Sequence, residues 1–164
     1  MYLTNAWYVA AWASELGAQP LARRILDTAV VLFRTADGTA AALEDSCPHR
    51  RLPLSLGCPT GQGLRCGYHG ILFDTAGRCI EIPGQQVIPP TARVRAWPLV
   101  ERWGLLWIWM GEPTLADPDR IIASGWEVRD RAELQRVRDT LDTAGIAYKQ
   151  LSQGEADDRR VEEV

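Results

Sequence analysis

The strongest constraint on this chain is the placement of its two histidines, because each of them follows a cysteine within three residues. Cys47 and His49 form the first pair, and Cys66 and His69 form the second, with sixteen residues between the pairs. The 164 residues contain only 2 His and 4 Cys, so random placement would rarely put both histidines beside cysteines. Each pair is short enough to supply two ligands from one tight loop. The pattern therefore predicts two facing loops that hold a metal group together.

The residue types of the two pairs indicate which metal group they hold. Thiolates and neutral imidazoles in combination suit iron–sulfur clusters, zinc or copper. A set in which each loop supplies one cysteine and one histidine favours a Rieske [2Fe–2S] cluster, because one of its irons takes two cysteines and the other takes two histidines. We therefore predict that Cys47 and Cys66 ligate one iron and that His49 and His69 ligate the other.

Two other interpretations of the same four residues compete with the cluster. A structural zinc site also uses two cysteines and two histidines, but it normally presents them as a cysteine pair followed by a histidine pair. Here the two residue types alternate, and a single residue separates Cys47 from His49. Histidines that pack as hydrogen-bonded core residues are a further alternative, which the paired spacing disfavours. A zinc-stabilised binding module stays as the less favoured prediction.

Residues beside the four candidate ligands complete the predicted site. Glycines in the second loop would let the backbone approach a bulky inorganic group, and a proline stiffens the first loop. Arginines after the first histidine would lie at the exposed tip, where an electron donor or acceptor docks. The residues predicted to surround the cluster or to meet a partner are Pro48, Arg50, Arg51, Gly67, Tyr68 and Gly70.

The scaffold that carries these loops is predicted to be all-β. Short apolar or alternating stretches are separated by turn residues, and most prolines lie between the stretches, where a missing N–H does little harm. Residues 36–38 and 75–78 have the composition of hairpin connections. We expect an antiparallel β sandwich or small barrel with two cluster-binding loops and a short C-terminal helix. The predicted strands are residues 6–11, 29–34, 39–45, 71–74, 79–82, 93–99 and 105–110.

The C-terminal part of the chain differs in composition from this scaffold. Charged residues are more than twice as frequent after residue 117 as before it. Asp130 and Glu133 have the spacing of a capping box, and an apolar stripe follows them, so a helix is expected there. The polar stretch after Tyr148 is expected to be partly disordered. The predicted division is a cluster-binding domain over residues 1–122 and a helical, partly disordered tail over residues 123–164.

Charge and hydropathy exclude several classes of partner. The chain has 18 basic and 21 acidic residues, so it lacks the clustered positive charge of a nucleic-acid-binding protein. No apolar run approaches the roughly 20 residues that span a membrane. The N-terminus has no basic segment and reaches Glu15 too early for a secretory signal, which predicts a cytoplasmic protein. In that reducing compartment Cys58 and Cys79 are expected to be small buried residues without a disulfide.

Longer stretches around the two loops carry a resemblance to a known family. The first loop reads EDSCPHR at residues 44–50 and PLSLG at residues 53–57, and the second reads CGYHG at residues 66–70. Further matching stretches lie at residues 5–10, 82–85 and 102–104.

Residues 1–122 resemble the N-terminal Rieske domain of ring-hydroxylating and O-demethylating oxygenases, and they look most like the oxygenase subunits of vanillate O-demethylases. One departure is Arg51, at a position where a small residue is common in the family. The resemblance implies the Rieske fold and a Rieske [2Fe–2S] cluster. It also implies a flavin or ferredoxin-type reductase as electron donor.

The resemblance further implies a destination for the electron. In the family, a second domain holds a mononuclear iron with two histidines and one carboxylate. Both histidines of this chain are assigned to the cluster, so we expect no such site within it. The predicted function is single-electron transfer from the reductase toward a catalytic oxygenase site elsewhere, and a free-standing Rieske ferredoxin is the alternative. Whether the chain is itself an enzyme is left open by the sequence.

Overall fold

Two apolar runs of the sequence form central strands of the fold. The computed structural model describes residues 2–123, in which β3 (Thr28–Arg34) and β11 (Leu105–Met110) each lie between two neighbouring strands. Four consecutive residues of β3, from Val30 to Phe33, are fully buried. A short continuous apolar run is typical of a strand that is covered on both faces. The prediction of a buried central strand at residues 105–110 is confirmed.

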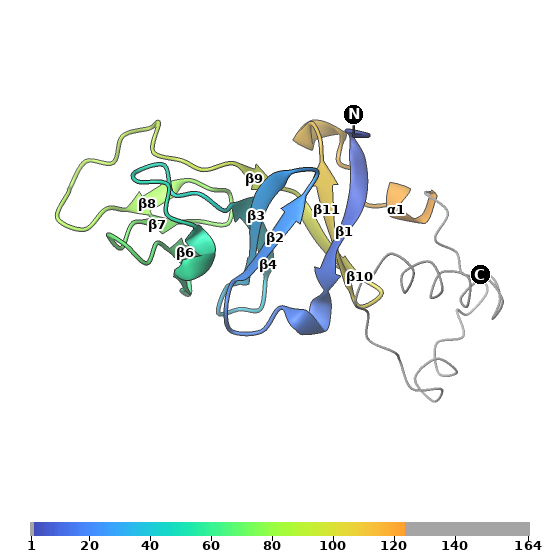
Figure 1. Ribbon diagram of the computed structural model, residues 1–164, viewed down its shortest axis with the longest axis horizontal. Coiled ribbons are helices and arrows are strands. Elements are labelled where there is room, and N and C mark those ends of the chain that lie inside the picture. Colours follow the sequence, from blue (N-terminus) through green and yellow to red (C-terminus); the bar gives the residue numbers. More distant parts are fainter. Residues whose placement is uncertain (1, 124–164) are drawn as a thin grey trace. The chain divides into compact units, whose positions relative to one another are not determined.

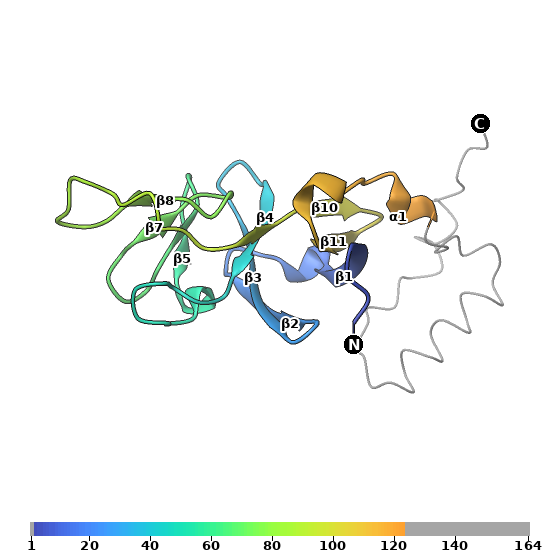
Figure 2. The same ribbon diagram turned by 90° about the horizontal axis from the view of Figure 1, so that it is seen from above.

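All the strands pair in antiparallel fashion and form three small sheets, which confirms the predicted all-β class. In spatial order, the first sheet contains β1 (Ala6–Trp12), β11 and β10 (Leu99–Arg102). The second sheet contains β2 (Leu21–Ile25), β3, β4 (Ala40–Glu44) and β9 (Ala96–Trp97), and the third contains β5 (Cys58–Pro59), β6 (Leu64–Arg65), β7 (Leu72–Phe73) and β8 (Cys79–Glu81). The third sheet lies at one end of residues 2–121, the first lies at the other end, and the second lies between them (Figures 1 and 2). The helical elements of the described residues are η1 (Ala13–Glu15), η2 (Leu54–Leu56), η3 (Pro113–Leu115) and α1 (Arg120–Ala123).

Strand β3 contributes to two hydrophobic cores, because successive side chains of a strand point to opposite faces. Val31 and Phe33 belong to the core between the second and third sheets, which also contains both cysteines of the candidate site. Val30 and Leu32 belong to the core between the first and second sheets. The sheet that carries the first cluster loop is therefore packed on both sides.

The single strand predicted over residues 93–99 is wrong in detail. This segment forms β9, which pairs with β4, and then β10, which pairs with β11 in a different sheet. Pro98 lies between the two strands and has no N–H to donate to a ladder. Its carbonyl still accepts a hydrogen bond from the Trp109 amide (2.9 Å). The chain therefore changes sheets at the proline.

The tail was predicted for residues 123–164, of which residues 124–164, including the predicted helix, lie outside the described residues; the division at residue 122 stays a prediction. The described residues end with the short helix α1. In the part of the chain that the structure describes, no helix has the length and apolar character needed to cross a membrane.

Gly57, which ends η2, generates the first testable prediction. A β-carbon at this position would overlap the Arg65 carbonyl oxygen and would lie 2.9 Å from the Leu54 carbonyl oxygen. Because both neighbours are backbone atoms, they cannot move aside as a flexible side chain does. We expect Gly57→Ala to lower the free energy of unfolding by about 1–3 kcal/mol, measured by chemical denaturation.

Gly17 provides the matched control for this substitution, because a β-carbon there would meet no atom within 4 Å. Gly17→Ala should leave the free energy of unfolding within about 0.5 kcal/mol of wild type. Equal losses for the two variants would contradict the close backbone contact at Gly57.

Candidate metal centre

The first candidate loop follows β4 and is closed by backbone hydrogen bonds around its cysteine. The Cys47 amide donates to the Leu52 carbonyl (2.9 Å), and the Arg51 amide donates to the Cys47 carbonyl (2.8 Å). Arg51 has a φ of 59°, in the left-handed region that favours glycine. At the base of the loop, the Asp45 carboxylate accepts hydrogen bonds from the amide and the hydroxyl of Ser55, both at 2.7 Å. The loop is thus fixed at its tip and at its base.

The second candidate loop, between β6 and β7, repeats the same hydrogen-bond pattern. The Cys66 amide donates to the Ile71 carbonyl (2.8 Å), and the Gly70 amide donates to the Cys66 carbonyl (3.1 Å). Gly70 has a φ of 73° and occupies the position that Arg51 occupies in the first loop. The two loops are therefore built on one backbone plan, with a left-handed residue at the same place in each.

The glycines of the second loop are required by contacts within the protein. A β-carbon on Gly67 would lie 2.6 Å from the Leu56 carbonyl oxygen. Gly70 combines its left-handed φ with a close approach to the Pro83 ring, 3.2 Å from the position of a β-carbon. Glycine is therefore needed at both positions because of contacts within the protein, in addition to the expected approach of an inorganic group. In the first loop, Pro48 is exposed.

The four candidate ligands form two pairs. The thiols of Cys47 and Cys66 are buried, whereas the rings of His49 and His69 are exposed. Burial raises the pKa of the Cys47 thiol, and the neighbouring Cys66 thiol raises it further. The two histidines turn their Nδ1 atoms toward each other, 3.1 Å apart. Two nitrogens bound to one tetrahedral metal at about 2.0–2.1 Å would be roughly 3.4 Å apart, so the imidazole pair is close to a chelating geometry.

The separation into pairs agrees with a two-iron group better than with a single ion. A structural zinc would need all four side chains to converge on one point. Among residues 2–123, no group of three or more His, Cys, Asp or Glu side chains is placed to hold one metal ion. A thiol pair next to an imidazole pair matches the Rieske arrangement, in which each iron takes only two protein ligands. The donor set and its geometry therefore fit the cluster.

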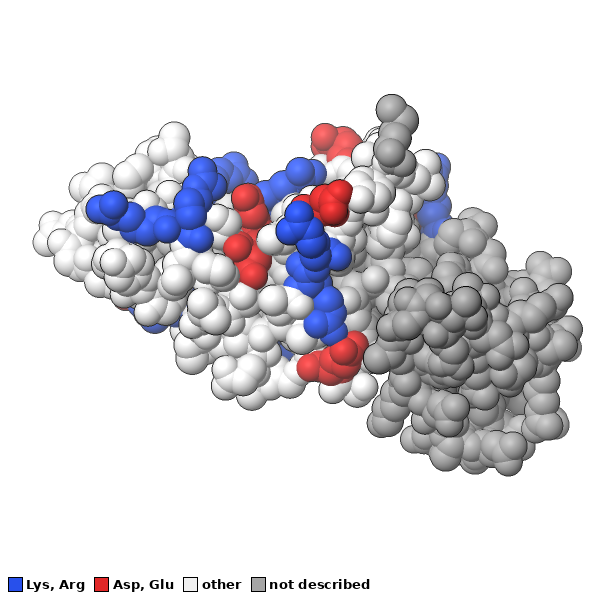
Figure 3. Space-filling model, in the orientation of Figure 1, with Lys and Arg blue, Asp and Glu red and all other residues white. Residues whose placement is uncertain are grey.

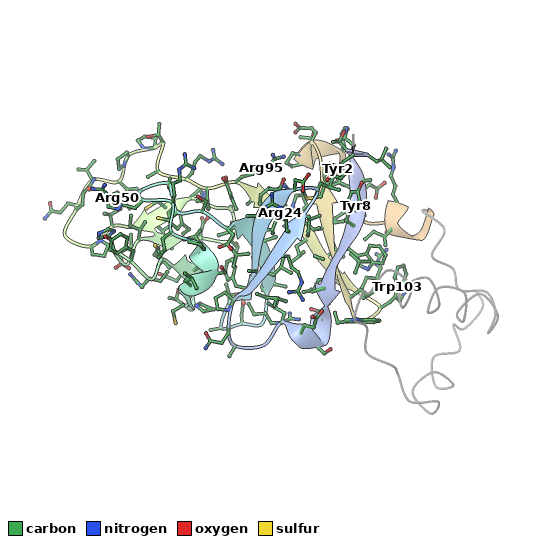
Figure 4. All side chains as sticks on the ribbon, in the orientation of Figure 1. Tyr2, Tyr8, Arg24, Arg50, Arg95 and Trp103 are labelled. Atoms are coloured by element: carbon green, nitrogen blue, oxygen red, sulfur yellow. The ribbon has the colours of Figure 1, made fainter. Side chains whose placement is uncertain are left out.

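Exposed aromatic and basic residues are next to the two candidate histidines in the chain. The Tyr68 ring stacks on the His69 ring with centroids 3.8 Å apart, and 61% of Tyr68 is exposed. Arg50 and Arg51 are exposed, and neither forms an ion pair within the described residues. Figure 4 places Arg50 at the end of the fold that carries the third sheet, and Figure 3 shows basic side chains crossing this end. The tip is therefore positively charged.

Two residues at the base of the second loop were not predicted from the sequence. The Arg65 guanidinium forms two hydrogen bonds with the Glu81 carboxylate, at 2.8 and 2.9 Å. This contact lowers the pKa of the Glu81 carboxyl, so the pair is charged at neutral pH. The partners are sixteen positions apart in the chain and meet because the third sheet brings β6 and β8 together. The opposite charges at strand positions are the only sequence signal of this contact.

The two remaining cysteines behave differently from each other. Cys58 and Cys79 are both free cysteines in the structure. Cys79 is buried in the core between the second and third sheets, whereas Cys58 is exposed. The prediction that Cys58 is buried is wrong: Cys58 is opposite the partly exposed Arg65, whereas Cys79 is opposite Phe73 in the core.

Comparison with known proteins identifies the class of this fold and site. Residues 6–98 match the family described as Rieske [2Fe-2S] domain. The chain therefore belongs to the Rieske [2Fe–2S] domain family, and the predicted resemblance and Rieske-type cluster are confirmed.

Individual relatives define the likeness further. The chain is 56% identical to the iron-sulfur subunit TsaM2 of Comamonas testosteroni over 77% of this chain and 36% of that protein. It is 40% identical to the vanillate O-demethylase oxygenase subunit of a Pseudomonas species, over 77% of this chain and 35% of that protein. The crystal structure of dicamba monooxygenase superposes with a TM-score of 0.70 at 50% identity, covering 73% of this chain and 38% of that one.

The names of these relatives describe a monooxygenase system, an oxygenase subunit and a monooxygenase. The chain spans little more than a third of the length of the relatives it matches. The zinc-stabilised module predicted as an alternative is disfavoured by the family match.

The left-handed backbone of Arg51 generates the second prediction. A β-branched residue is poorly tolerated at a positive φ, whereas glycine adopts it without strain. We expect Arg51→Val to have a free energy of unfolding about 1–2 kcal/mol lower than that of Arg51→Gly. Thermal or chemical denaturation of the two variants measures the difference.

Arg50 is the control position, because it is equally exposed and its φ is not positive. At this position we expect no preference for glycine, so the free energy of unfolding of Arg50→Val should be at least as high as that of Arg50→Gly. The same preference for glycine at both positions would contradict a special backbone conformation at Arg51.

Proposed function

We propose that Cys47 and Cys66 ligate one iron of a Rieske [2Fe–2S] cluster, that His49 and His69 ligate the other, and that the chain transfers single electrons from a reductase toward an oxygenase iron. The observation that carries this proposal is the pairing of the candidate ligands, with two buried thiols behind two exposed imidazoles whose Nδ1 atoms are 3.1 Å apart. When bound, such a cluster accepts and releases one electron at a time.

The side chains of the site have separate tasks in this function. The hydrophobic core around Cys47 and Cys66 excludes water from the sulfur side. The exposed rings of His49 and His69 provide the shortest distance between the metal group and a protein partner. Gly67 keeps the two loops in backbone contact, so that the ligand positions are held together.

The histidine content supports an electron carrier rather than a complete oxygenase within these residues. The sequence has 2 His, and both are assigned here to the cluster. A mononuclear oxygenase iron uses two histidines and a carboxylate, so we propose that this iron lies outside the printed residues. A free-standing Rieske ferredoxin is the alternative, and the similarity to oxygenase components favours the first proposal.

The positively charged tip is the proposed docking surface for the electron donor. Arg50 and Arg51 lie beside His49, and Tyr68 covers one face of His69. A flavin or ferredoxin-type reductase with an acidic surface would be attracted to this tip and oriented with its redox group near the imidazoles. The reductase partner, like the cytoplasmic location, stays a prediction.

Replacement of one thiol ligand tests the cluster assignment. We expect Cys66→Ser to abolish the visible absorption of the cluster and the EPR signal of its reduced form, because a hydroxyl is a poor substitute for a thiolate ligand. Cys58→Ser, which changes an exposed cysteine, should retain both signals. If Cys66→Ser keeps its iron, its sulfide and its spectrum, the ligand assignment is wrong.

Charge removal at the tip tests the docking surface. Arg51→Gly removes a positive charge and introduces the residue that fits the left-handed backbone best. In stopped-flow reduction by a reductase, the second-order rate constant should fall by about two- to fivefold at low salt, and the difference should shrink at high salt. Arg24→Gln, on β2 of the second sheet, should leave the rate unchanged.

Product analysis distinguishes the electron carrier from a complete oxygenase. The chain with a reductase and an aromatic substrate such as vanillate should consume reducing equivalents only through cluster reduction and should release no demethylated product. Product formation by these components alone would overturn the electron-carrier proposal.

A further inference from the structure

Arg65, the residue before the candidate ligand Cys66, is bound at three points. Its Nη1 donates to Glu81 Oε1 (2.9 Å), and its Nη2 donates to Glu81 Oε2 (2.8 Å). Its Nη1 also donates to the Gly70 carbonyl (2.7 Å). Gly70 directly follows His69, so a single guanidinium connects the two ends of the second loop and joins them to β8.

The position of the pair in the third sheet explains how the two side chains meet. Arg65 is opposite Leu72 in the pairing of β6 with β7, and Leu72 is opposite Glu81 in the pairing of β7 with β8. Opposed residues of antiparallel strands place their side chains on the same face. Leu72 is 2% exposed and belongs to neither of the two hydrophobic cores. The ion pair therefore bridges β6 and β8 across Leu72 and covers it.

An ion pair in the adjacent turn provides a contrast. Arg78 contacts Asp74 at 2.8 Å, four residues earlier, and so connects only the two sides of the β7–β8 turn. It therefore joins no third strand and does not reach the candidate ligand loop. The Arg65–Glu81 pair differs because it is bidentate, spans three strands and binds the backbone of a candidate ligand loop.

We infer that Arg65 and Glu81 are positioning residues for the second cluster loop: Glu81 orients the Arg65 guanidinium, which holds the Gly70 carbonyl and thereby fixes His69 for ligation. This inference rests on the proposed cluster ligation. The pair also has no net charge, so it supports the loop without adding an uncompensated charge next to the metal group.

Single substitutions separate the charge of each partner from the hydrogen bonds of the pair. Arg65→Gln leaves the Glu81 carboxylate uncompensated, and a nearby negative charge disfavours the added electron, so the reduction potential should fall. Glu81→Gln leaves the Arg65 charge uncompensated, so the potential should rise. The double variant should return close to the wild-type potential, because neither charge remains.

The rate of cluster loss reports the positioning role. Bleaching of the visible absorption in the presence of an iron chelator should be several-fold faster in Arg65→Gln and in the double variant, because both lose the bond to the Gly70 carbonyl. Glu81→Gln, which keeps that bond, should bleach more slowly than Arg65→Gln. Arg65→Lys keeps the charge but lacks the planar fork, so its potential should stay near wild type while its bleaching is faster.

Arg78→Gln is the matched control, and it should alter neither the potential nor the bleaching rate. If Arg65→Gln moves these two quantities no further than Arg78→Gln does, or moves only the unfolding temperature, the positioning role is overturned. If Arg65→Gln does not fold, the reduction potential and the bleaching rate of Arg65→Lys and Glu81→Gln are compared with those of Arg78→Gln instead. A wild-type chain that binds no iron and sulfide would instead refute the proposed function on which the inference rests.

Discussion

Backbone contact between the two loops is the constraint on which the site depends. Gly57 packs against the carbonyl of Arg65, and Gly67 packs against the carbonyl of Leu56. No side chain lies between the loops at these points, so their separation is set by backbone atoms that cannot change rotamer. These backbone contacts therefore help to bring the four candidate ligands together.

The candidate cysteines are buried and the candidate histidines are exposed because of where the two loops leave the sheets. The cysteines start the loops and pack into the core between the second and third sheets, whereas the histidines lie two or three residues further on and reach the surface. A metal group held in this way is shielded from water on its sulfur side and open on its nitrogen side. The same geometry serves retention of the group and exchange of electrons with a partner.

Sequence patterns predicted the features that depend on residues close to one another in the chain. The spacing of Cys47 and His49 predicted the first loop, and apolar runs predicted β3 and β11. Strand β2 was missed because Arg23 occupies its inward row, where it donates to the Ala10 carbonyl (3.2 Å) and to Glu15 (2.6 Å). Contacts such as Arg65–Glu81 depend on the register of three strands, which no local pattern specifies.

Strand β3 has side chains in both hydrophobic cores and therefore connects the core beneath the cluster loops to the core beneath the first sheet. Neither core can open without exposing one face of the same strand, so the two ends of residues 2–121 are expected to unfold cooperatively. Any group that binds only the folded loops stabilises the whole cooperative unit by mass action. The slowest-exchanging amides of β11, at the far end from the site, would then report whether the loops hold their metal group.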